Sequence, residues 1–116
     1  MKNRLYRGVD TQENELVFGS LIVGCACLYI CIEQKVGLFH MKPVQVNSVG
    51  VSLGIKDNEG TILFEGDKIK SFFGQEYELV YVMGEILAED KNGFLYPIKE
   101  INKPVKIGGI YERFLI

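Results

Sequence analysis

Apolar and polar residues alternate over many short stretches of this chain, and turns rich in Gly, Asp and Asn separate these stretches. A period of two is typical of β-strands with one buried face, and no long stretch carries a helical stripe. Segment 33–41 shows no clear period, and 97–102 has room for one helical turn. The alternation predicts strands at 4–8, 15–23, 26–32, 48–54, 61–64, 68–73, 76–83, 94–96 and 105–111, with a short extended piece at 43–46.

Short strands separated by frequent turns predict an all-β fold with one or two short helical turns. Small barrels and sandwiches of short antiparallel strands are the architectures that this pattern favours. The chain has 116 residues, of which 47% are hydrophobic. That length fits one domain, 1–116, with a core that needs no metal or disulfide.

The strand predicted at 26–32 has two apolar faces, so it is expected to lie inside the sheet and to be covered on both sides. Gly19 and Gly24 are expected to interrupt the apolar run that leads into it. One face would carry Leu28, Ile30 and Ile32, and the other Cys25, Cys27, Tyr29 and Cys31.

Two turns have nearly the same composition, Lys56-Asp57-Asn58-Glu59-Gly60 and Asp90-Lys91-Asn92-Gly93. Asp and Asn side chains bond to nearby backbone, and the closing glycine suits the left-handed position of a type I turn with a bulge. Both segments therefore predict β-hairpins, and the first is the strongest such signal in the chain.

Charge and cysteine content narrow the classes of function. The 13 Lys and Arg and 15 Asp and Glu give a net charge of −2, which argues against strong generic binding to nucleic acid. No apolar leader follows the N-terminus, and the apolar run Leu21–Ile32 is too short to span a membrane. Three cysteines, an odd number, do not suggest a disulfide framework. A cytoplasmic location without membrane contact is expected.

The step Glu65-Gly66-Asp67, with Asp57 nearby, is the first candidate for chemistry. Paired carboxylates can bind a metal or act as an acid and a base. The favoured interpretation is structural: Asp67 would bond backbone N–H groups, and Gly66 would supply a positive φ. A hydrolase built on these carboxylates is the third-ranked hypothesis.

A zinc site formed by Cys25, Cys27, Cys31 and His40 is the second candidate. Zinc ligands normally come from a Cys-x2–4-Cys knuckle on a turn, whereas these cysteines fall within an apolar run. Buried core cysteines are favoured, and no nucleophile motif accompanies His40. No catalytic residue, metal or cofactor is predicted.

A basic surface with aromatic rings is the third candidate. Rings beside lysines bind single-stranded nucleic acid in small barrels, by stacking on bases. With a net charge of −2, an ordinary solvated face is the favoured interpretation. The residues concerned are Lys68, Lys70, Lys91, Lys99, Lys103 and Lys106, with Phe72, Phe73, Phe94 and Tyr96.

The segment 49–67 resembles the signature of the YopX-like family of phage and prophage proteins, in which a Lys-Asp turn is followed by a Glu-Gly-Asp step. Segments 4–21 and 106–112 resemble the family's opening and closing elements, although Arg113-Phe114 stands in place of an Asn-Pro tail. The resemblance implies a mostly β, barrel-like fold, a phage or prophage origin and no enzymatic activity. The structural motif that carries it comprises Gly54, Lys56, Asp57, Gly60, Glu65, Gly66, Asp67, Gly109, Tyr111 and Glu112.

The sequence thus favours a non-enzymatic accessory protein that acts through contacts with a phage or host protein, or through self-association into an oligomer. A weak single-stranded nucleic-acid-binding module is the alternative.

Overall fold

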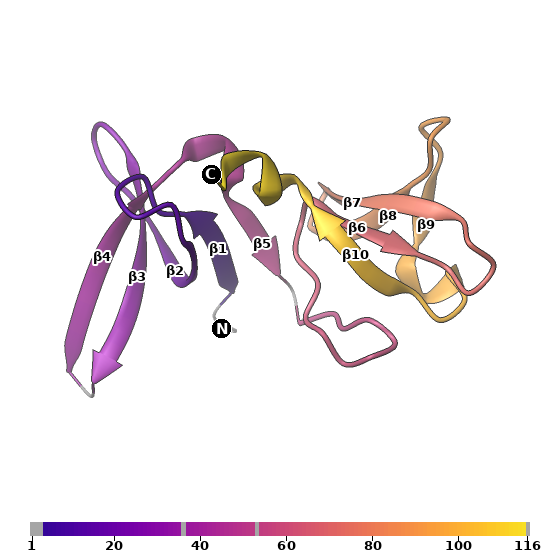
Figure 1. Ribbon diagram of the computed structural model, residues 1–116, viewed down its shortest axis with the longest axis horizontal. Coiled ribbons are helices and arrows are strands. Elements are labelled where there is room, and N and C mark those ends of the chain that lie inside the picture. The colour runs from indigo at the N-terminus through magenta and orange to yellow at the C-terminus, as the bar shows by residue number, and fades with distance from the viewer. Residues whose placement is uncertain (1–3, 36, 53, 116) are drawn as a thin grey trace. The chain divides into compact units, whose positions relative to one another are not determined.

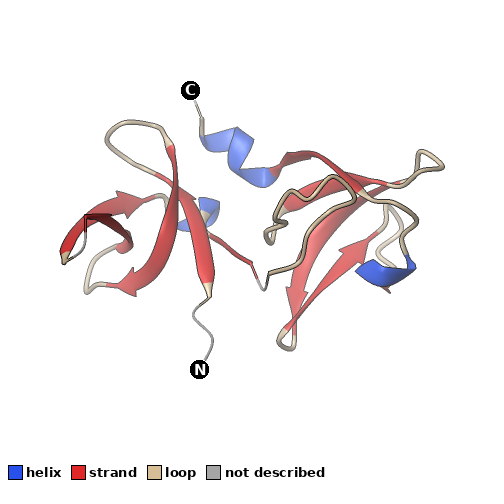
Figure 2. Ribbon diagram, turned by 90° about the horizontal axis from the view of Figure 1, so that it is seen from below, coloured by secondary structure: helices blue, strands red, loops and turns tan. Residues whose placement is uncertain are grey.

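The computed structural model describes residues 4–35, 37–52 and 54–115, and Figures 1 and 2 show its strands and turns. The chain divides into two compact units. Unit 1 comprises Met1–Val51 and Tyr111–Ile116, and unit 2 comprises Ser52–Ile110. Each unit has its own antiparallel sheet and its own core.

The sheet of unit 1 has the strand order β4-β3-β2-β1-β5 (Figure 1). Hairpin connections join β1 to β2, β2 to β3 and β3 to β4, and 3₁₀ turns precede β5 and end the chain. The elements are β1 (Leu5–Val9), β2 (Leu16–Val23), β3 (Leu28–Lys35), β4 (Leu38–Val44), η1 (Val46–Ser48), β5 (Gly50–Ser52) and η3 (Ile110–Phe114).

One face of this sheet forms the core of unit 1. Val17, Ile30 and Val44 are buried there, from β2, β3 and β4 respectively. Strands can approach closely at Gly19, where a Cβ would overlap the Cys31 carbonyl oxygen. Gly19 therefore lies within a continuous β2, and the strand predicted at 15–23 is present as Leu16–Val23.

The sheet curls at one end, so that β4 meets the end of β1. Asp10 bridges Val44, and the Thr11 N–H donates to the Pro43 carbonyl at 2.9 Å. The Gln45 N–H donates to the Val9 carbonyl at the same distance. Only the C-terminal part of β4 is covered in this way, and the burial along β4 follows: Leu38 to Met41 are exposed, whereas Val44 is buried.

The sheet of unit 2 has the order β10-β6-β7-β8-β9. Its core consists of apolar side chains from β6, β7 and β8 with Leu63 and Ile101, and tyrosines pack against it. Tyr77, Leu79 and Tyr81 of β7 face this core. The elements are β6 (Asp67–Lys70), β7 (Glu76–Val82), β8 (Glu85–Glu89), β9 (Leu95–Pro97), η2 (Ile98–Glu100) and β10 (Val105–Gly109).

Three turns of unit 2 share one hydrogen-bond pattern, and two of them are the predicted hairpin turns. In each, the first residue's N–H donates to the carbonyl four residues later, and a glycine with φ of 86–87° donates back to the first carbonyl. The turns begin at Asp57, Ser71 and Asp90. The side-chain oxygen of each first residue also accepts the backbone N–H four residues on. This is the type I turn with a glycine bulge that the sequence predicts for the first and third.

The prediction of an all-β fold is confirmed. Two strands were not predicted, β4 and β8, and the strand expected at 61–64 is reduced to a single bridge between Lys56 and Ile62. The predicted helical turn near 97–102 is present as η2, with two further 3₁₀ turns. Within the described residues, no helix has the length and apolar character needed to cross a membrane.

The β7–β8 turn explains one of the missed strands and supplies a prediction. Met83 and Gly84 are its two central residues, with φ of 51° and 86°, and Val82 pairs with Glu85. Positive φ at both positions is typical of a type I′ turn, which favours Asn-Gly, and Met83 gains nothing from burial because it is 98% exposed.

Met83→Asn is therefore expected to raise the free energy of unfolding by about 0.5–1 kcal/mol, since Asn adopts the left-handed region more readily. Urea denaturation followed by circular dichroism measures the change. Met83→Ala is the control, because it removes the same side chain without relieving the strain. Equal stability of the two variants would contradict the turn assignment.

Candidate functional site

Asp57 is bonded to backbone on two sides. Its Oδ1 accepts the N–H groups of Glu59 at 2.9 Å and Thr61 at 2.8 Å, which closes its own turn. Its Oδ2 accepts the N–H of Lys106 at 3.0 Å, 49 residues away in the chain. Burial raises the pKa of Asp57, but the N–H groups of Lys106, Thr61, Glu59 and Gly60 outweigh that effect and lower the pKa.

Asp67 is buried at the start of β6 and also bonds backbone. Its Oδ2 accepts the Phe64 N–H at 2.8 Å, and its Oδ1 lies 3.6 Å from the Lys106 ammonium nitrogen. Gly66, with φ of 89°, turns the chain between these residues, and its N–H donates to the Leu79 carbonyl at 2.8 Å. The positive φ predicted for Gly66 and the backbone bond predicted for Asp67 are both present.

Lys106 is the residue that both aspartates hold. Asp57 binds its backbone N–H, and Asp67 binds its ammonium group. A bulge in the β10–β6 pairing lies directly after it, between Lys106 and Gly108. The Asn58 N–H adds a bond to the Pro104 carbonyl at 2.7 Å. The acidic segment thus fastens β10 to the turn that begins at Asp57.

The remaining residues of the predicted motif are divided between the units. Gly54 and Gly60 take positive φ, Lys56 is exposed at its bridge to Ile62, and Glu65 is half-buried. Gly109 pairs with Asp67 in the β10–β6 register. In unit 1, the Arg7 guanidinium lies 4.3 Å from the centre of the Tyr111 ring, and Glu112 is exposed on η3. The structure therefore brings Asp57 and Asp67 together at Lys106, and Gly109 lies opposite Asp67.

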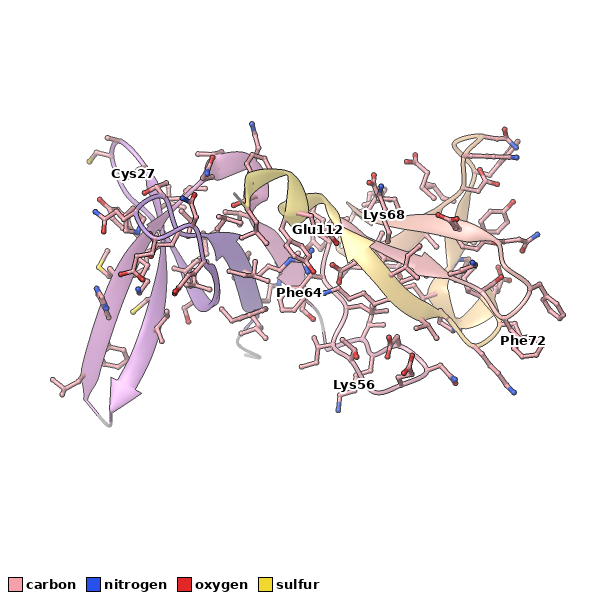
Figure 3. All side chains as sticks on the ribbon, viewed as in Figure 1. Cys27, Lys56, Phe64, Lys68, Phe72 and Glu112 are labelled. Atoms are coloured by element: carbon pink, nitrogen blue, oxygen red, sulfur yellow. The ribbon has the colours of Figure 1, made fainter. Side chains whose placement is uncertain are left out.

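The predicted grouping of cysteines is wrong. Cys25 and Cys27 lie in the β2–β3 connection, where Cys25 is exposed and Cys27 is half-buried (Figure 3 labels Cys27). Cys31 lies on β3 opposite Met41, so it faces the other side of the sheet from His40. Turn formation at Gly24, whose N–H donates to the Cys27 carbonyl, removes the first two cysteines from the strand. Over the described part of the chain, no three His, Cys, Asp or Glu side chains are grouped as a metal requires.

Three of the six lysines of the predicted basic surface lie beside carboxylates. Lys68 pairs with Glu78 and Lys70 with Glu76 across β6 and β7, and Lys106 is held by Asp67. Lys103 differs, because its ammonium nitrogen lies 5.3 Å from the centre of the Phe72 ring. Carboxylates are therefore interspersed among these lysines in the β10–β6–β7 part of the sheet.

Phe72 and Phe73 occupy the tip of the β6–β7 turn, with 67% and 74% of their surface exposed. Their ring centres are 5.4 Å apart in an edge-to-face arrangement. Figure 3 shows Phe72 projecting from this turn. The predicted proximity of an aromatic ring to a lysine is therefore present at this turn, where Lys103 lies over Phe72 and Phe73 contacts Phe72.

Sequence reasoning missed a surface in unit 1, on the sheet face opposite its core. Leu5, Phe18, Phe39 and Met41 lie on that face, and we call these four residues the apolar face. Their exposed fractions are 37%, 45%, 65% and 44%. A shallow hollow of about 400 Å³ lies beside them and includes Cys31. The alternation of Phe39 and Met41 with His40 and Lys42, after the turn residue Gly37, was the signal that could have revealed it.

A comparison with models of known families and a comparison with curated proteins find no match to this chain.

Two aspartates with the same turn chemistry provide a matched test of the site. Asp90 repeats the bonds of Asp57 within its turn, accepting the Asn92 and Phe94 N–H groups, but its second oxygen meets only the Tyr96 hydroxyl. Asp57→Ala is expected to cost about 2–3 kcal/mol because it also leaves the Lys106 N–H without its acceptor, and Asp90→Ala about 1 kcal/mol.

Urea denaturation at pH 7 measures both free energies of unfolding. A hydrogen-exchange measurement adds a local control, because only Asp57→Ala should speed exchange of the Lys106 amide. Equal costs for the two variants, with no change at Lys106, would contradict the fastening role.

Proposed function

We propose that this chain is a binding protein of phage or prophage origin, which acts without catalysis through contact with another protein. The observation that carries the proposal is the apolar face of unit 1. Four large apolar side chains lie on a sheet face opposite a formed core, and the structure gives them no role in that core. Contiguous exposed apolar surface of this kind is typical of interaction sites.

The acidic segment supports the same proposal by the kind of contacts it makes. Asp57 and Asp67 are buried, and both are occupied by backbone N–H groups and by Lys106. A general base must reach a substrate proton, and these carboxylates instead meet the ordinary requirements of turns and strand ends. The resemblance of 49–67 to the YopX-like signature supports the phage origin, and on this proposal the signature marks a fold.

Capture from phage-infected bacteria tests the proposal with matched variants. Tagged wild-type chain is expected to retain a defined protein after cross-linking, either a partner or an untagged second copy. Phe18→Ser with Phe39→Ser should reduce that capture at least tenfold, because both rings leave the apolar face.

Phe72→Ser with Phe73→Ser is the control, since it removes two rings from unit 2 that are more exposed than Phe18 and Phe39 and should leave capture unchanged. Circular dichroism must show that both double variants fold. Capture that is absent from wild type, or equal in all three proteins, would contradict the proposal.

Weak binding of single-stranded nucleic acid is the second candidate, and the tip of the β6–β7 turn favours it. Phe72 and Phe73 are exposed and lie beside Lys103, a combination that suits stacking on bases. The net charge of −2 and the pairing of Lys68 and Lys70 with glutamates oppose it.

Fluorescence anisotropy with a labelled single-stranded oligonucleotide distinguishes this candidate. It requires binding at low salt that weakens steeply as salt is added, and a loss of roughly 1–3 kcal/mol per ring in Phe72→Ala and Phe73→Ala. Phe94→Ala, at the exposed β8–β9 turn, is the matched control. Absence of binding at low salt removes the candidate and leaves the protein-binding proposal intact.

A further inference from the structure

The edge of the unit 1 sheet is open along half of β4. At its C-terminal end, β4 is covered by the end of β1, through Asp10 and Thr11. From Leu38 to Met41, the described structure gives β4 only one strand neighbour, which is β3. Figure 1 shows β4 as the outer strand beside β3. A strand edge of this kind presents backbone donors and acceptors to another strand.

The bond from Thr11 fixes which backbone groups face outward. The Pro43 carbonyl points toward Thr11 and therefore away from β3. In an antiparallel strand, the N–H and C=O of one residue point to the same side, and successive residues alternate. The N–H and C=O groups of Met41 and Phe39 consequently point outward as well, at the open part of the edge.

β4 contains a lysine and a proline, but neither protects the open part of its edge. Lysine and proline are the residues that commonly prevent an edge from pairing. The Lys42 ammonium lies 3.5 Å from Asp10 and 3.4 Å from Glu13, so its charge is directed to the β1–β2 loop. Pro43 lies where β1 already covers the edge. The segment Leu38–Met41 contains no Asp, Glu, Lys or Arg.

We propose that two copies of this chain pair through β4, in an antiparallel arrangement about a two-fold axis at His40. In that register Phe39 of one copy lies opposite Met41 of the other, and their outward backbone groups form four hydrogen bonds. The inference rests on the proposed function, because it names a second copy of this chain as the protein that Phe39 and Met41 of the apolar face contact.

A second copy fits this edge better than an unrelated strand does. The two-fold axis places Phe39 and Met41 of both copies on one side of the joined sheet, each beside its own Phe18 and Leu5. The apolar faces of the two copies then become continuous. The uncharged segment Leu38–Met41 of one copy faces the same segment of the other. A net charge of −2 per chain gives little repulsion between the copies.

Substitution of Phe39 and Met41 by charged residues tests the register. Wild-type chain should sediment as a dimer whose population rises with concentration. Phe39→Lys with Met41→Lys should weaken dimerisation at least tenfold, because lysines of the two copies then face each other. Phe39→Glu with Met41→Glu should do the same, and an equimolar mixture of the two variants should regain the dimer as a heterodimer.

A disulfide gives a second measurement that does not depend on these variants. Residues facing each other in a non-hydrogen-bonded antiparallel pair have Cα atoms about 4.5 Å apart, within the range that a disulfide spans. In a chain with Cys25, Cys27 and Cys31 changed to Ser, His40→Cys should cross-link on mild oxidation. Leu38→Cys should not, because Lys42 of the other copy lies opposite it.

A wild-type chain that stays monomeric up to several hundred micromolar would overturn the inference. So would a dimer that survives both charge variants, or one that cross-links through Leu38→Cys and not through His40→Cys. A monomer that still captures a different protein through Phe18 and Phe39 would refute this inference and support the proposed function. A monomer that captures nothing would refute both.

Discussion

The attachment of β10 by Asp57 and Asp67 is the interaction on which unit 2 depends most. β10 is an edge strand, and a bulge after Lys106 interrupts its hydrogen-bonded pairing with β6. Asp57 supplies an acceptor for the Lys106 N–H, and Asp67 supplies a counter-charge for its ammonium group. Hydrogen bonds to a charged group contribute roughly 1.5–3 kcal/mol each, against about 5–15 kcal/mol for a whole domain. The bond from the Lys106 N–H to Asp57, which Asp90 lacks, is therefore expected to account for about 1–2 kcal/mol of the stability of this unit.

Unit 1 is organised by a different constraint, the partial closure of its sheet. The bridge from Asp10 to Val44 brings β1 against β4 and buries Val44, but the bonds stop at Thr11. The remaining length of β4 therefore stays open, and Phe39 and Met41 stay exposed beside it. Complete burial of a Phe side chain is worth about 1.5–3 kcal/mol, so covering the exposed part of Phe39 would release a useful share of that energy.

Local turn chemistry could be predicted from sequence, whereas long-range pairing could not. The turns at Asp57 and Asp90 follow from an Asp that bonds backbone and a Gly that takes positive φ, and both rules act within five residues. β8 was missed because Met83 is an unusual residue at positive φ, and β4 because its alternation begins only at Phe39, after six residues without a clear period. The placement of Lys106 between two aspartates could not be predicted, since it depends on a bond across 49 residues.

The edge strands of the two sheets differ in the features that prevent pairing with another strand. This difference supports the proposed role of β4. In unit 2, β9 has three residues and ends in Pro97, while β10 carries a bulge. In unit 1, β5 has three residues and all are buried. Short length, proline and bulges are the means by which proteins prevent edges from pairing. β4 has seven residues, and its open part, Leu38–Met41, carries neither proline nor a charged residue. The register shift in its pairing with β3 lies on the β3 side, between Glu33 and Lys35. The other three edge strands are short, bulged or end in proline, whereas β4 is open over the uncharged segment Leu38–Met41. This asymmetry is expected of an edge that pairs with another strand.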